Sequence, residues 1–175
     1  MRTPITKSLQ RVALLMGIIG TISLLSACWY YSFSGTSIPS SVRTVSIAYI
    51  ENKAQLVNPA LSNLLTEKLK DKYRKMTRLE FVDEEGDFSF EGEITQYENT
   101  TMGFTADEVG ALNRLTISVK IYFNSIEEGK SFEKSFSKYA DYSSEKSFDA
   151  EESNLVDLIT EDLIEDIFNA TAADW

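Results

Sequence analysis

Hydrophobic and polar residues alternate without a break from Leu115 to Phe123. The apolar positions are Leu115, Ile117, Val119, Ile121 and Phe123, and the positions between them are Thr116, Ser118, Lys120 and Tyr122. A period of two is typical of a β-strand with one face in the core and the other in water. This one-sided burial favours an antiparallel sheet with the segment at its centre.

Two other segments repeat their apolar residues at spacings of three and four, which is typical of amphipathic helices. The first follows Asn58, a predicted N-cap, and Pro59, and it runs to Met76. Its apolar positions are Leu61, Leu64, Leu65, Leu69, Tyr73 and Met76. The second spans Ser153–Asn169, with apolar positions Leu155, Leu158, Ile159, Leu163, Ile167 and Phe168. Each helix therefore has one face that must cover a sheet.

Shorter alternating segments predict the rest of the sheet. The strands predicted beside the central one are residues 42–49, 79–82, 88–95 and 131–142. In the first strand, Val45, Ile47 and Tyr49 share the core face. Residues 83–87 are predicted to join the second and third strands as a tight hairpin turn. The polar residues 97–111 are predicted to form a loop, which at this length is often functional.

The last predicted strand places Phe132 and Phe136 on the same face as Lys134 and Lys138. Lysines at such positions protect an exposed sheet edge from pairing with another chain. They would equally suit a ligand that has both apolar and phosphate groups. We favour protection of the edge and keep the ligand site as the alternative.

The order strand, helix, four strands, helix predicts an α+β fold. Two amphipathic helices packed on one face of a mostly antiparallel, four- to five-stranded sheet would bury every apolar stripe. We expect residues 42–170 to form this single domain, which is an ordinary domain size. Residues 171–175 are expected to be a C-terminal tail.

The N-terminus has the pattern of a lipoprotein signal peptide. Its apolar run, Val12–Leu25, has 14 residues, whereas a membrane-spanning helix needs about 20. The run follows three basic residues, which are Arg2, Lys7 and Arg11. It ends in the lipobox Leu25, Ser26, Ala27 and Cys28. We therefore expect residues 1–27 to be removed and Cys28 to carry a thioether-linked lipid.

Cys28 is the only cysteine, so a disulfide within one chain is impossible. The alternative to a lipid anchor is a free thiol after an ordinary secretory signal. Residues 28–41 are rich in serine and aromatic residues. We expect this tether to dock on the domain or on a partner, or else to rest in the membrane interface.

The net charge of the chain limits the classes of partner that it can bind. It has 17 basic and 27 acidic residues, a net charge of −10, and loss of the signal peptide makes this −13. Such a charge disfavours nucleic acid as a partner. The chain also has no histidine, which removes the commonest general base and zinc ligand. We expect no metal and no cofactor.

One basic cluster stands out in this acidic chain. It consists of Lys68, Lys70, Lys72, Arg74, Lys75 and Arg78, at the end of the first helix. Cations there complement the negative end of the helix dipole, and we favour this explanation. The alternative is a site for an anionic head group or an acidic partner.

Two groups of carboxylates suggest other chemistry. Asp83, Glu84, Glu85 and Asp87 could bind calcium, but their spacing does not match the twelve-residue calcium loop. Glu91 and Glu93 could serve a glycosidase, but that reaction needs a pocket between two carboxylates. We favour a solvated turn and a solvated strand face, and we expect no enzymatic activity.

Several short motifs, in their order and spacing, resemble the LptE family of lipopolysaccharide-assembly lipoproteins in the form found in Bacteroidetes. They follow the lipobox and cover nearly all of the mature chain. These motifs are Tyr31–Gly35, Pro39, Val42–Val45, Glu51–Lys53, Val57–Pro59, Leu61–Glu67, Glu91–Ile94 and Arg114–Ile117. No lipopolysaccharide-contacting residue of the family matches a motif in this sequence.

The resemblance implies a non-enzymatic outer-membrane lipoprotein on the periplasmic face. Its domain would sit as a plug inside the LptD β-barrel, support assembly of that barrel and help lipopolysaccharide reach the outer leaflet. The expected partners are LptD, lipopolysaccharide and, through Cys28, outer-membrane lipid. The alternatives are a solitary lipoprotein that binds another envelope component and a carboxylate-based envelope hydrolase.

Overall fold

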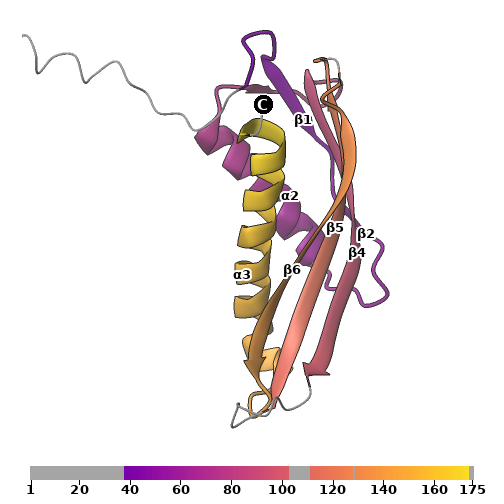
Figure 1. Cartoon of the computed structure of the whole chain (residues 1–175), viewed down its shortest axis with the longest axis vertical. Coiled ribbons are helices and arrows are strands. Elements are labelled where there is room, and N and C mark those ends of the chain that lie inside the picture. The colour runs from indigo at the N-terminus through magenta and orange to yellow at the C-terminus, as the bar shows by residue number, and fades with distance from the viewer. Residues whose placement is uncertain (1–37, 103–110, 128, 174–175) are drawn as a thin grey trace, which may run out of the picture. The chain divides into compact units, whose positions relative to one another are not determined.

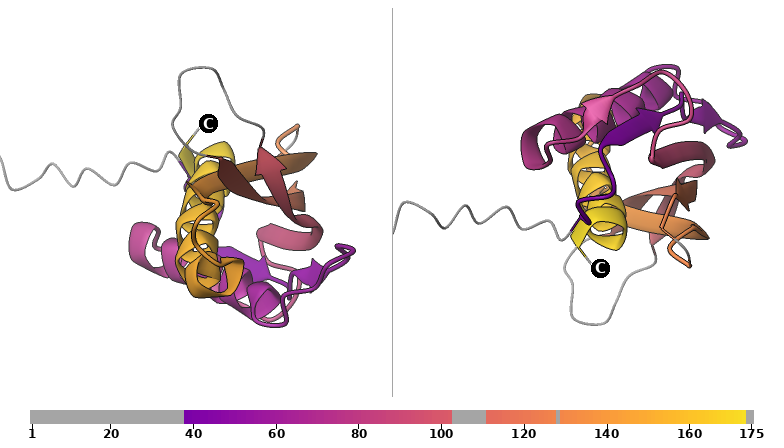
Figure 2. Two further views of the ribbon diagram at one scale, coloured as in Figure 1. Left: turned by 90° about the horizontal axis from the view of Figure 1, so that it is seen from below. Right: turned by 90° about the horizontal axis from the view of Figure 1, so that it is seen from above.

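The computed structural model describes residues 38–102, 111–127 and 129–173. All of them belong to the unit Gly35–Trp175. Its elements, in chain order, are β1 (Thr44–Ile47), β2 (Glu51–Asn52), α2 (Leu61–Met76), β3 (Glu80–Phe81), β4 (Phe88–Met102), β5 (Leu112–Ser125), β6 (Phe132–Ser143), α3 (Phe148–Phe168) and η2 (Asn169–Ala173). Both helices pack on one face of the sheet (Figures 1 and 2), so the predicted two-layer α+β architecture is confirmed.

The sheet is mixed, which corrects the prediction of a mostly antiparallel one. The strand order is β3-β1-β4-β5-β6, and the short β2 pairs with β4. β1 pairs in parallel with both β3 and β4, whereas β4, β5 and β6 are antiparallel. The reason is the crossover through α2, because a helix between two neighbouring strands returns the chain in the same direction.

The predicted hairpin between the second and third strands is wrong, because β1 lies between β3 and β4. The connection crosses β1 at Gly86, where an added Cβ would lie 2.5 Å from the Ser46 backbone nitrogen. Only glycine allows two backbones to approach so closely. Beside this crossing, the Asp87 carboxylate accepts hydrogen bonds from the Arg43 and Thr44 backbone N–H groups at 2.7 and 2.9 Å.

Residues 97–102, the first part of the predicted loop, belong instead to a strand. β4 continues to Met102 and β5 begins at Leu112, so the two form one long hairpin. The register shifts between Ile94 and Gln96, which is a β-bulge that brings Tyr97 rather than Gln96 into the core. This shift interrupts the alternation from which the sequence predicts a strand. The far end of the hairpin is polar. Its side chains form hydrogen bonds between strands, as Asn99 of β4 does with the Tyr142 hydroxyl of β6.

The core lies between the sheet and the two helices. The five apolar residues predicted for β5 are all buried, so this strand is confirmed as central. Three predicted core residues are instead exposed, which are Tyr49, Met76 and Leu158. Tyr49 follows the end of β1 and Met76 is the last residue of α2. On α3, Val156 and Ile164 are buried while Leu158 faces water.

The helix ends also differ from the prediction. α2 begins at Leu61, two residues after Pro59, and its N-cap is Ala60. Asn58 instead forms a turn, in which its side-chain oxygen accepts the Ala60 N–H at 3.0 Å. α3 begins five residues before the predicted Ser153, and helical backbone continues through η2 to Ala173. In η2 the Thr171 and Ala172 side chains are fully buried.

Candidate functional site

The lipobox residues Leu25, Ser26, Ala27 and Cys28 lie outside the described residues, as does the tether up to residue 37. The lipid anchor on Cys28 therefore stays a prediction from the sequence. Within the part of the chain that the structure describes, no helix is long and apolar enough to span a membrane.

The basic cluster on α2 lies against the acidic side of α3. The Lys68 ammonium donates to the Asp157 carboxylate at 3.0 Å and to the Thr160 hydroxyl at 3.1 Å. Lys72 forms an ion pair with Glu165 and lies 5.2 Å from the centre of the Phe168 ring. These contacts tie the two helices together along a groove of about 270 Å³. A structural role thus accounts for Lys68 and Lys72.

The other four cations of the cluster divide into two pairs. Lys70 and Arg74 form ion pairs within α2, with Glu67 at 3.3 Å and Asp71 at 3.0 Å. Lys75 and Arg78 are exposed, and neither has an ion pair among the described residues. The unneutralised positive charge of the cluster is therefore at its C-terminal end, next to the exposed Met76.

The two lysines of β6 lie in different surroundings, although both point toward α3. Lys138 forms an ion pair with Asp166 at 2.8 Å, and hydrogen bonding to this carboxylate raises the Lys138 pKa. Lys134 is exposed, has no ion pair among the described residues and lies 5.0 Å from the centre of the Phe136 ring. Only Lys134 therefore keeps a free charge on this strand face.

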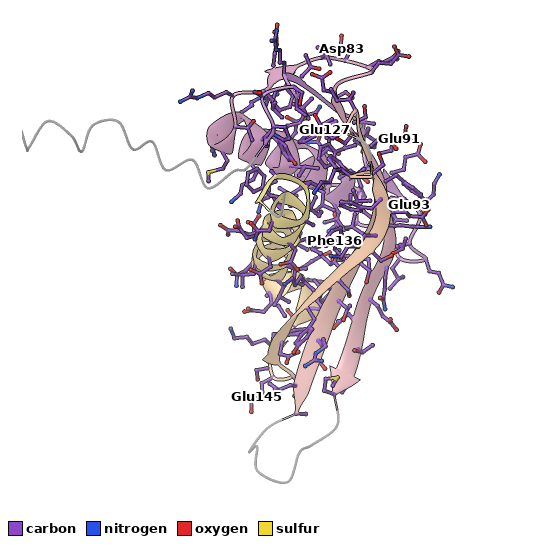
Figure 3. The ribbon with its side chains drawn as sticks, turned by 45° about the horizontal axis from the view of Figure 1, so that its top comes forward. Asp83, Glu91, Glu93, Glu127, Phe136 and Glu145 are labelled. Carbon is purple, nitrogen blue, oxygen red and sulfur yellow. The ribbon has the colours of Figure 1, made fainter. Side chains whose placement is uncertain are left out.

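A groove of about 340 Å³ runs beside Lys134. It is lined by the β6 residues 134–137 and, across from them, by Asp166 of α3 and Ala170 of η2. Figure 3 shows Phe136 on the helix side of β6. The lysines of β6 indicate an edge strand already in the sequence. The sequence analysis missed the opposite wall of the groove, because it ended the second helix at Asn169 and did not predict η2.

The outer face of the sheet carries contacts that the sequence analysis missed. Arg114 makes a two-pronged ion pair with Asp141, at 2.6 and 2.8 Å, and stacks on Tyr139. Hydrogen bonds from Arg114 lower the pKa of Asp141. Ser118 joins Gln96 to Ser137 through two hydrogen bonds of 2.9 Å. Finding these contacts requires knowing which residues of neighbouring strands lie opposite each other, and the sequence does not give this register directly.

The carboxylates singled out in the sequence occupy two places. Asp87 caps backbone N–H groups, and these hydrogen bonds lower its pKa. Glu91 and Glu93 lie on the side of the sheet away from the helices (Figure 3), around a hollow of about 320 Å³ with Tyr49 and Tyr122. Among the described residues, no three acidic side chains are grouped closely enough to hold a metal ion.

Comparison with known proteins identifies a family and several solved structures. A family model described as "LptE: Lipopolysaccharide-assembly" matches residues 42–171. No curated relative matches the sequence.

Comparison with solved structures finds matches, among them these three. Protein XCC0632 from Xanthomonas campestris is 9% identical, with 75% of this chain and 84% of that chain covered and a TM-score of 0.52. The hypothetical protein CT253 from Chlamydia trachomatis is 9% identical, with 76% and 99% covered and a TM-score of 0.51. Rare lipoprotein B from Shewanella oneidensis is 15% identical, with 73% and 90% covered and a TM-score of 0.45. At these identities the likeness to XCC0632 and CT253 concerns the fold alone.

Proposed function

The chain belongs to the LptE lipopolysaccharide-assembly family, and from this premise we propose that it is an outer-membrane lipoprotein that plugs the LptD β-barrel. In this role it supports barrel assembly and helps deliver lipopolysaccharide to the outer leaflet. The observation that carries the proposal is the extent of the family match, which runs from before β1 into η2.

The lipobox supports the same proposal. A lipid on Cys28 would hold the domain near the membrane, because the 14 residues from Cys28 to Ser41 reach at most about 50 Å when fully extended. Stable anchoring requires about two acyl chains. The domain would thus stay within reach of a barrel in the same membrane, on its periplasmic face.

Co-purification tests the partnership. The full-length protein, tagged after Trp175 and extracted from membranes with a mild detergent, should carry a large barrel protein with it. Depletion of the protein should lower both the amount of folded barrel and the lipopolysaccharide at the cell surface. If depletion leaves both unchanged, the plug function is refuted and a solitary lipoprotein takes its place.

Metabolic labelling tests the anchor. A labelled fatty acid should be incorporated into the native protein and not into Cys28→Ala, which should accumulate as an uncleaved or mislocalised precursor. Equal labelling of the two proteins would contradict the lipid anchor without bearing on the barrel.

For direct contact with lipopolysaccharide, we propose the end of the basic cluster at Lys75 and Arg78. Both cations are exposed and flank Met76, so they offer positive charge beside an apolar side chain. The double variant Lys75→Glu, Arg78→Glu should weaken binding of lipopolysaccharide in a salt-dependent way, since exposed charges are screened over about 10 Å at 0.1 M salt. Its melting temperature should stay close to that of the native protein.

The matched control is Lys68→Glu, Lys72→Glu, which makes the same change of charge earlier in the basic cluster. This variant should lower the melting temperature, because it replaces two ion pairs between α2 and α3 with repulsion. Native affinity of the Lys75→Glu, Arg78→Glu variant for lipopolysaccharide would show that the cluster only stabilises and solvates the helix.

A further inference from the structure

β6 forms one edge of the sheet. Among the described residues it pairs only with β5, along twelve residues from Phe132 to Ser143. Alternate backbone N–H and C=O groups on its other side point away from β5. An edge of this length is a ready template for another strand unless something blocks it.

The groove beside β6 opens onto this edge. Its wall includes the four consecutive residues 134–137, whose side chains alternate between the two faces of the sheet. A groove can touch all four only from the edge of the strand, where their backbone is accessible. Asp166 and Ala170 form the opposite wall. An edge strand facing a helix across a groove is the geometry in which extended peptides bind by adding a strand.

The lysines on β6 decide which strand could enter. A charge that points toward the core side of an edge opposes pairing, because an added strand would cover it without a counter-charge. Asp166 already neutralises Lys138 at 2.8 Å. Lys134 has no such partner among the described residues, and its ammonium lies over the Phe136 ring. The unpaired charge of Lys134 is therefore what still opposes the pairing of another strand with β6. A carboxylate on the incoming strand would neutralise this charge.

We propose that the groove between β6 and the end of α3 binds an extended segment of a second protein, which pairs with residues 133–137 as an additional strand. This segment has a carboxylate opposite Lys134 and an apolar residue two positions away, against Phe136 and Ala170. The spacing follows because side chains two apart in a strand share one face. Lys134 thus selects for an acidic partner strand and rejects others. The inference concerns the chemistry of the segment and does not rest on a barrel as its source.

Two synthetic peptides test the proposal with the full-length protein in detergent. Both are about ten residues long, with threonine at alternate positions. In the first peptide, the face opposite the threonines has a glutamate and a leucine two positions apart. The second peptide is identical except that lysine replaces the glutamate. Fluorescence anisotropy should show about tenfold tighter binding of the glutamate peptide, because the lysine peptide places like charges together. Hydrogen–deuterium exchange should slow in β6 and stay unchanged at β3, the opposite edge.

Charge reversal sharpens the test. Lys134→Glu should invert the preference between the two peptides, and Lys134→Ala should abolish it while keeping binding. Lys146→Glu is the control, because Lys146 is exposed and pairs with Glu151 away from the groove. It should bind both peptides as the native protein does.

The remaining outcomes overturn the proposal. Equal affinity of the native protein for the two peptides would refute selection by Lys134. No binding, or binding without slower exchange in β6, would refute strand addition at this edge. Light scattering tests whether the protein forms a dimer without peptide. A dimer in which β6 exchanges slowly would show that a second copy of this chain, and not a different protein, occupies the groove.

Discussion

The two faces of β5 have the same backbone and the same neighbours, but they are stabilised differently. Toward the helices, every second side chain from Leu115 to Phe123 is at most 1% exposed. Away from the helices, the side chains form local contacts, such as Ser118 with Ser137 and Lys120 with Glu133. Aromatic rings add to the inner face, where Phe123 packs against Phe88 and Phe90.

This difference indicates where the molecule can change without unfolding. Each apolar side chain buried on the inner face contributes about 1.5–3 kcal/mol to stability. A polar replacement loses this contribution and also buries a polar group that has no hydrogen-bond partner. An exposed ion pair contributes little, because water and salt screen it. Contacts with partners can therefore vary on the outer face and the free edge, while the inner face maintains the fold.

The largest expected effect is on the inner face of β5. Val119→Asp places a carboxylate at a position with 0% exposure and should destabilise the domain by more than about 4 kcal/mol. Circular dichroism should show loss of the cooperative melting transition. A variant that melts like the native protein would show that this face is not the core.

A smaller effect is expected where α2 meets η2. The Tyr73 hydroxyl donates to the Thr171 hydroxyl at 2.6 Å, since Thr171 donates its own hydrogen to the Ile167 carbonyl at 2.7 Å. Burial raises the pKa of Tyr73. Tyr73→Phe keeps the ring and loses the hydrogen bond, so it should cost about 1 kcal/mol. Urea unfolding measures this value, and an unchanged midpoint would contradict the contribution of η2 to stability.

Asp87 gives a prediction that depends on pH. Its hydrogen bonds to the Arg43 and Thr44 backbone N–H groups lower its pKa in the folded protein. The carboxylate therefore stabilises the fold above the ordinary pKa of about 4, and this contribution is lost as pH falls through the lowered value. Asp87→Asn should melt a little below the native protein at neutral pH, with the difference disappearing in strong acid. A difference that persists there would rule out the charge as its cause.

The smallest effect is expected on the outer face of β5. Lys120→Asp introduces the same side chain as the largest-effect variant, one position along the strand. It breaks the ion pair with the exposed Glu133 and removes the contact of the half-buried Lys120 with the Tyr122 ring. Its melting temperature should stay within a few degrees of the native value. Unfolding as complete as that of Val119→Asp would remove the contrast between the two faces.

Part of the fold can be predicted because it depends on local periodicity. The alternation along β5 and the spacings of three and four along α2 and α3 identify these three elements and most of their buried residues. Predictions fail at the ends of elements, because the apolar pattern continues to positions that the core does not cover. Tyr49 lies beyond the end of β1 and Met76 is the last residue of α2, and both are exposed. They also fail at the bulge after Ile94, because one extra residue exchanges the two faces.

The candidate sites divide in the same way. The lipobox at Cys28 and the basic cluster are visible as sequence patterns, and so are the lysines of β6. Their surroundings are not, because Lys68 and Lys72 find their carboxylates 89 and 93 residues further along the chain. The sequence alone also could not distinguish Lys134 from Lys138, since only the position of Asp166 on α3 neutralises one of them.

Taken by itself, the sequence determines the signal peptide pattern, the acidic charge, the two amphipathic helices and the central strand, since each depends on residues close together in the chain. Tertiary structure decides the placement of β1 between β3 and β4, the ion pairs between helices and the groove beside β6. These features depend on which segments become neighbours. That choice follows from the crossover through α2 and from the close approach at Gly86, which act between residues far apart in sequence.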